Sequence, residues 1–128
     1  MNNVIPSDVE QFLLRNIDSI AEIEGLILAR TDLKKEWDVI SISKRLYTNE
    51  KEAGALLAKM AERGLLLRTP GGKYKYCNQT SEQEMIIEKV VDAYRRFLLP
   101  VTSLIHSNAG KDRVQMFADA FIIKKEKD

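Results

Sequence analysis

The sequence predicts a mostly α-helical α+β domain in which short helices precede one β-hairpin and a long C-terminal helix. Three observations indicate this fold class. Helix-start signals recur along the chain, an apolar stripe at helical spacing ends at a glycine, and a Gly-Gly turn precedes alternating polar and aromatic residues. At 128 residues, the chain has the length of one compact domain.

The helix starts are marked by pairs in which an oxygen-bearing side chain is followed three residues later by glutamate. In such a capping box, the first side chain accepts a hydrogen bond from a free backbone N–H and the glutamate reaches back. The first two pairs predict helices over about residues 7–17 and 19–30. The four pairs are Ser7 with Glu10, Ser19 with Glu22, Asn49 with Glu52, and Ser81 with Glu84.

The segment between residues 31 and 47 is polar apart from Trp37 and a short apolar run. Trp37 is expected to anchor the core or a groove, because one large aromatic ring buries about 200 Å². A short strand over residues 38–40 is possible. Ser41 is then expected to cap a short helix with Ile42 and Leu46 inward, and Tyr47 is a further inward candidate.

The next segment predicts an amphipathic helix followed by a hairpin. Its apolar residues recur at i, i+3, i+4, i+7 and i+8, which places them on one buried stripe. Gly64 is expected to end the helix, and Pro70-Gly71-Gly72 to make the hairpin turn. The stripe consists of Ala53, Leu56, Leu57, Met60 and Ala61.

The C-terminal part predicts a long helix over about residues 81–107, with a kink or split near Pro100. Its apolar residues are spaced alternately by three and four, as in a seam between two helices. We therefore expect residues 81–128 to be a helical dimerisation segment within the same compact unit as residues 1–80. The seam comprises Ile87, Val90, Tyr94, Phe97, Val101 and Leu104.

Charge is distributed unevenly along the chain, although the net charge is only +1. Residues 1–40 carry four basic and eight acidic side chains, whereas residues 41–76 carry eight basic and three acidic ones. A basic excess confined to one segment is typical of a module that faces phosphates. The helix and hairpin described above lie within this basic segment.

The segment ISKRLYTNEKEAGALLAKMAERGLLLRTPGGKYKY, residues 42–76, resembles the winged helix-turn-helix domain of bacterial transcriptional regulators, MarR-like in the broad sense. Small uncharacterised bacterial winged-helix proteins are also similar. The resemblance covers about residues 19–78 and includes the Gly64-Leu65 pair that follows a recognition helix. It implies a recognition helix at about 50–63, a β-wing of two or three strands at about 65–78, and a cytoplasmic homodimer that binds double-stranded DNA.

The same resemblance implies a set of DNA-contacting residues. On the helix, they lie opposite the buried stripe, and the remaining ones lie on the preceding helix and the wing. Glu50 and Glu52 in the first turn oppose phosphate binding, although both suit the helix dipole. The alternative is therefore a non-catalytic winged helix that binds another protein. The expected DNA contacts are Ser43, Lys44, Lys51, Ala55, Lys59, Arg68, Lys73 and Lys75.

Other chemistry has little support in the sequence. There is one histidine, His106, and one cysteine, Cys77, and neither has nearby partners for a metal site or a nucleophile. We therefore expect no catalytic residues, no metal and no cofactor. Tyr94, Phe97 and Phe117 are candidates for an effector pocket or, alternatively, for packing; any effector is unknown. The N-terminus does not resemble a secretory signal, and no apolar run reaches the length of a bilayer span.

Overall fold

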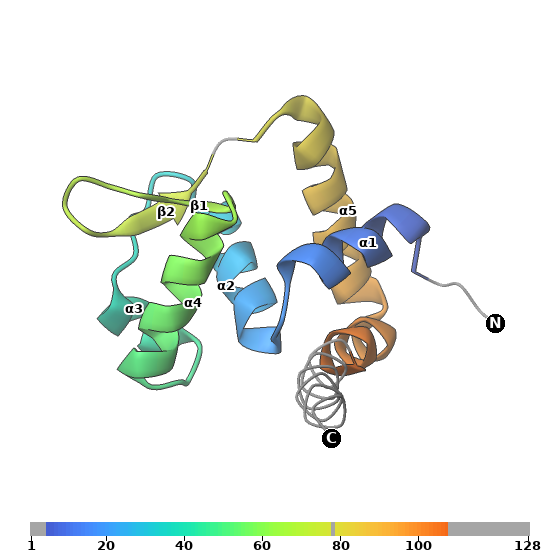
Figure 1. Cartoon of the computed structure of the whole chain (residues 1–128), viewed down its shortest axis with the longest axis horizontal. Helices are drawn as coiled ribbons and strands as arrows, with labels where there is room; N and C mark the ends of the chain where they lie inside the picture. The colour runs from blue at the N-terminus through green and yellow to red at the C-terminus, as the bar shows by residue number, and fades with distance from the viewer. Residues whose placement is uncertain (1–4, 78, 108–128) are drawn as a thin grey trace, which may run out of the picture.

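The computed structural model describes residues 5–77 and 79–107, and its arrangement is shown in Figure 1. One end of the molecule holds the helix-turn-helix and the hairpin, and the other holds the first and the last of the labelled helices. Residues 98–107 are also helical. The elements are α1 (Ser7–Asn16), α2 (Ile20–Thr31), α3 (Val39–Arg45), α4 (Glu50–Glu62), β1 (Leu66–Arg68), β2 (Tyr74–Tyr76) and α5 (Ser81–Arg96).

The order of these elements is that of a winged helix-turn-helix domain, which confirms the predicted fold class. Helix α4 contacts α2, α3 and β1, and the two strands pair antiparallel with Leu66 opposite Tyr76. An isolated bridge adds a third strand position, since Trp37 and Tyr74 exchange backbone hydrogen bonds of 2.6 and 2.8 Å. The wing is therefore joined to the chain segment that leads into α3.

The wing turns through Pro70-Gly71-Gly72, as predicted. The N–H of Gly72 donates to the carbonyl of Thr69 at 2.9 Å, and the Thr69 N–H donates to the Lys73 carbonyl at 2.7 Å. Gly72 has a φ of 81°, a left-handed conformation that glycine adopts without steric penalty. This is the three-residue hairpin loop that ends in a left-handed residue.

The predicted helix starts are correct for α2 and α4 and shifted for the others. Ser19 and Asn49 accept from the backbone N–H groups of Glu22 and Glu52. Helix α1 has Pro6 at its N-cap with no capping side chain, and α5 is capped by Thr80, one residue before Ser81. Thr80 and Gln83 have the same spacing and the same types of side chain as Ser81 and Glu84, one residue earlier, which explains the shift in α5.

The predicted strand over residues 38–40 is absent, and α3 begins three residues earlier than expected, since its N-cap is Asp38 and not Ser41. The Asp38 carboxylate accepts from the Ser41 N–H at 2.7 Å, while the Ser41 hydroxyl accepts from the Asp38 N–H at 3.1 Å. This reciprocal pair is a capping box that makes Asp38, and not Ser41, the N-cap. Tyr47 also differs from the expectation, since its side chain points outward and is 96% exposed.

The expected dimer seam on α5 is largely part of the core of one chain. Ile87, Val90 and Tyr94 on α5 and Val101 on the helix that follows are buried, and α5 packs against α1. The heptad-like spacing is real, but its partner is a helix of the same chain, so these four residues are not a surface for a second copy. Phe97 and Leu104 are partly buried against the same core.

The predicted break near Pro100 is confirmed. Helix α5 ends at Arg96 with Phe97 as its C-cap, and Pro100 falls in the first turn of the following helix. A proline is tolerated there because the first N–H groups of a helix have no helical partner. Within the described ranges, no helix is both long and apolar enough to span a bilayer. The predicted last helix, including Phe117, lies outside the described residues.

Candidate nucleic-acid interface

The outward face of α4 carries the residues expected to meet DNA. Ala53, Leu57 and Met60 are buried and fix the helix against the domain, so the opposite side faces solvent. Lys51, Ala55 and Lys59 are exposed, as the helical spacing predicts. Whether their charges are available depends on the neighbouring side chains.

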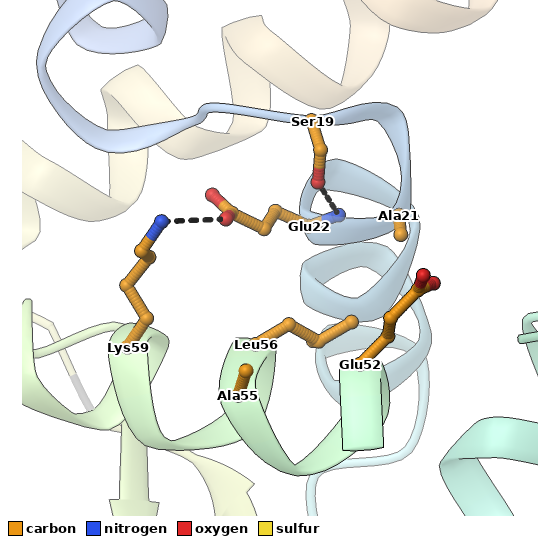
Figure 2. A pocket seen from close by; sticks show the side chains of 7 residues that line it. All are labelled: Ser19, Ala21, Glu22, Glu52, Ala55, Leu56 and Lys59. Carbon is orange, nitrogen blue, oxygen red and sulfur yellow. Dashed lines mark hydrogen bonds and ion pairs between the residues drawn. The ribbon is translucent and has the colours of Figure 1, made fainter. Parts of the chain in front are cut away.

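Lys59 and Arg63 are held by two carboxylates at the start of α2. Lys59 Nζ lies 3.0 Å from Asp18 and 3.6 Å from Glu22, and Figure 2 shows it pointing toward Glu22. The Arg63 guanidinium donates to Asp18 at 2.7 Å and to Glu22 at 3.0 Å, and also to the carbonyl of Asn16. Two of the eight cations of the basic segment are therefore neutralised within the fold.

This ion network shifts the pKa values of its members. Partial burial by itself would raise the pKa of Asp18, but the hydrogen bonds from Arg63 and Lys59 lower it overall. The pKa of Lys59 is raised, mainly by the bond to Asp18. Because the folded pKa of Asp18 is depressed, its contribution to stability is present above its ordinary value of 3.8 and is lost as the pH falls through the folded value.

A groove of about 280 Å³ runs between α2 and α4 along the same face. Figure 2 shows that Ala55 and Lys59 line it on the α4 side, with Ser19, Ala21 and Glu22 opposite. The carboxylates of Glu22 and Glu52 both belong to its wall. These carboxylates would repel a phosphate, so this part of α4 is poorly suited to contacts with the DNA backbone.

Replacing Glu22 with glutamine is expected to destabilise the fold by about 2 kcal/mol. The side chain is 5% exposed, and the amide keeps the size but removes the charge opposite Arg63 and Lys59. Urea denaturation measures the change in the free energy of unfolding. The control is Glu62→Gln, an exposed α4 carboxylate, expected within about 0.5 kcal/mol of wild type. Equal stability of the two variants would show that the network contributes nothing.

On α3, only one of the two expected contacts is accessible. Lys44 is exposed, whereas Ser43 is buried, and its hydroxyl donates to the Ile40 carbonyl at 2.8 Å. The Ser43 carbonyl accepts from the Thr48 N–H at 2.9 Å. Ser43 therefore stabilises the end of α3 from inside, which corrects its expected place among the DNA contacts.

The wing places its three cations on two faces. Lys75 lies opposite Leu67 in the ladder, whereas Arg68 lies opposite Tyr74, so Arg68 and Lys75 point to different sides of the hairpin. Lys73 is exposed and close enough to Asp38 for its charge to help lower the pKa of that carboxyl, after the larger effect of the hydrogen bonds from Ser41. No salt bridge to any of the three occurs among the described residues.

Two further cations gather around Trp37, and sequence reasoning did not select them. Lys35 Nζ lies 4.5 Å from the centre of the buried Trp37 ring, and the Arg45 guanidinium carbon lies 5.6 Å from it. Since Trp37 also pairs with Tyr74, basic side chains from the 32–38 loop, α3 and the wing meet in one region. In the sequence, Lys34 and Lys35 lie shortly before Trp37, and this is the feature that could have indicated the cluster.

The wing is also tied to α5. Glu84 accepts from the Arg30 guanidinium at 2.9 Å and from the Tyr76 hydroxyl at 2.7 Å. Burial and the bond to Glu84 raise the pKa of Tyr76. This contact between α2, β2 and α5 fixes the wing relative to α5.

Among solved structures, the chain is similar to the transcriptional regulator Tm0710 from Thermotoga maritima. The likeness covers 94% of this chain and 86% of that chain, with 17% sequence identity and a TM-score of 0.49. No family model matches the sequence, and no curated protein matches it. A likeness this distant carries no argument about function. The function is therefore argued from the residues described above.

The remaining candidates for chemistry within the described residues are His106, Cys77 and Tyr94. His106 is exposed and Cys77 is half-buried. Across residues 5–77 and 79–107, no three His, Cys, Asp or Glu side chains come together in a way that could hold a metal ion. Tyr94 packs between helices and donates its hydroxyl to Glu24 at 2.8 Å, which, after the larger effect of burial, helps to raise the pKa of Tyr94 to about 12.

Proposed function

We propose that the protein is a DNA-binding transcriptional regulator of a bacterial cytoplasm, with α4 as the recognition helix and the β1–β2 hairpin as the wing. One observation carries this proposal. In a winged helix-turn-helix fold, six of the eight cations of residues 41–76 make no salt bridge among the described residues. These are Lys44, Arg45, Lys51, Arg68, Lys73 and Lys75.

The distribution of these cations determines how binding would work. The wing and α3 supply most of them, so phosphate contacts there position the protein on the duplex. Lys51 and Ala55 are the residues of α4 left to approach base edges, because Lys59 is neutralised by Asp18 and Glu22. We therefore propose strong dependence on the DNA backbone and limited direct recognition of bases.

The protein-interaction alternative is supported by a different observation. The exposed part of α4 carries Glu50, Glu52 and Glu62, and Glu52 lines the groove next to α2. Such a surface favours a basic or polar protein partner over DNA. A winged helix of this second kind would bind no duplex at low salt. The two functions therefore separate in a direct binding experiment.

Selection of bound fragments from a random DNA pool tests the proposal. A regulator acting as a homodimer enriches a palindrome whose half-sites lie about one helical turn apart, because a two-fold dimer presents two recognition helices. Enrichment of a single half-site supports DNA binding by a monomer and contradicts the dimer. No enrichment by the folded protein contradicts the proposed function.

A further inference from the structure

Tyr47, in the turn between α3 and α4, has a backbone conformation that its side chain disfavours. Its φ is 55°, and no other non-glycine residue among residues 5–77 and 79–107 has a positive φ. Its ring is 96% exposed. Neither packing nor a hydrogen bond of the ring within the described chain accounts for a tyrosine at this position.

The chain contains an internal comparison for this turn. After α3, Tyr47 N–H donates to the Lys44 carbonyl and Thr48 N–H to the Ser43 carbonyl at 2.9 Å. After α4, Gly64 N–H donates to the Ala61 carbonyl and the following N–H to Met60, with the same spacing. Both are Schellman motifs, whose left-handed position is usually glycine.

The two motifs differ in the residue that occupies this position. Gly64 has a φ of 80° and adopts it freely, whereas the Cβ of Tyr47 opposes the same conformation. Non-glycine residues in this region persist where the surrounding structure holds them, and they gather at functional sites. The tyrosine at position 47 therefore lowers stability without an evident structural return.

The surroundings of Tyr47 indicate what its ring would meet. Tyr47 lies two residues before Asn49, the N-cap of the proposed recognition helix. Lys44 and Lys51 lie on either side of it in sequence, both exposed and without a salt bridge in the part of the chain that the structure describes. Ile40 and Lys44 lie four residues apart on one face of α3, and Ile40 is 52% exposed.

We propose that Tyr47 is a DNA-backbone contact beside the start of the recognition helix, an assignment that rests on the proposed function. Its ring packs against a deoxyribose, its hydroxyl donates to a phosphate oxygen, and Lys44 and Lys51 bind the neighbouring phosphates. Tyrosine is among the side chains that make such positioning contacts. Lysine is depleted in the cores of protein–protein interfaces, so the two exposed lysines that flank Tyr47 in the sequence favour a nucleic acid over a protein.

The test compares Tyr47→Asn and Tyr47→Phe with Gly64→Ala. Asparagine tolerates the left-handed conformation, so Tyr47→Asn is expected to raise the melting temperature by roughly 3 °C. Its affinity for a labelled duplex of roughly 30 base pairs, long enough for two half-sites, is expected to fall at least ~10-fold at fixed salt. Tyr47→Phe, which lacks only the hydroxyl, is expected to lose less.

Gly64→Ala provides the opposite pattern. A Cβ there meets nothing within 4 Å, so only backbone strain is added, and the melting temperature falls while the affinity for DNA is unchanged. If wild type binds the duplex and Tyr47→Asn binds it equally well, the inference is overturned and the proposed function stands. If the folded wild type binds no duplex at low salt, the proposed function fails first. If Tyr47→Asn keeps DNA binding but alters sedimentation, Tyr47 contacts protein, which also overturns the inference.

Discussion

Replacing Val90 with glutamate is expected to unfold the chain, not to separate a dimer into folded monomers. Val90 is fully buried on α5, which packs against α1, so the new carboxylate would lie within the apolar core. Burying an unpaired charge lowers the free energy of unfolding by about 4 kcal/mol or more, which is close to the whole stability of a marginally stable small domain. Urea denaturation and circular dichroism measure this loss.

The matched control is glutamate at an exposed leucine of the same region. Leu99 is 76% exposed, and Leu99→Glu is expected to change the free energy of unfolding by no more than about 0.5 kcal/mol. A Val90→Glu variant that is folded and sediments as a monomer, beside a wild type that sediments as a dimer, would contradict the core assignment. It would restore the seam between two chains that the spacing of α5 first indicated.

The double replacement Lys73→Glu and Lys75→Glu is expected to reduce affinity for all DNA sequences about 100-fold at physiological salt. Both side chains lie on the wing, and each is expected to lose one phosphate contact and to add a repulsive charge. The slope of log affinity against log salt should become shallower by about 2. Fluorescence anisotropy at several salt concentrations measures both quantities.

A second double variant separates the wing from net charge. Arg15 on α1 and Arg95 on α5 are exposed, make no salt bridge among the described residues, and lie outside the helix-turn-helix and wing. Arg15→Glu with Arg95→Glu changes the net charge by the same amount and is expected to leave most of the affinity intact. If both double variants lost affinity equally, the wing would not be the contact.

Local signals in the sequence were sufficient for much of the fold. The apolar stripe of α4 and Gly64 define that helix to within a residue of the structure, because capping, burial and a left-handed terminus agree over a short stretch. Pro70-Gly71-Gly72 likewise predicts the turn of the wing, and the hydrogen bonds of that turn confirm it. The boundary of α3 was missed, since Asp38 and Ser41 can both cap a helix.

The errors concern contacts between residues far apart in the chain. The spacing of Val90 and its neighbours shows that one face of α5 is buried, but spacing does not identify the covering helix, which is α1. Lys59 occupies the exposed face that periodicity predicts, yet its charge is neutralised by Asp18, 41 residues earlier. Periodicity gives the face of a helix and does not give the ion pairs formed after folding.

The proposed DNA contacts are partly predictable from the sequence. Lys44, Lys51, Lys73 and Lys75 were chosen from position and charge, and the structure leaves them without salt bridges among the described residues. Tyr47 was expected inward because the period of α3 was extended past its end. Its place at a left-handed position depends on where the helix stops, which the apolar pattern alone does not specify.

The affinity of the wild-type protein for duplex DNA as a function of salt tests the central claim most directly. Six cations of α3, α4 and the wing make no salt bridge among the described residues. They predict tight binding at about 50 mM salt and a slope of log affinity against log salt of about −3 or steeper. Anisotropy with a labelled duplex, on protein shown to be folded by circular dichroism, provides the measurement. No binding at low salt, or binding insensitive to salt, would contradict the assignment of this surface to DNA.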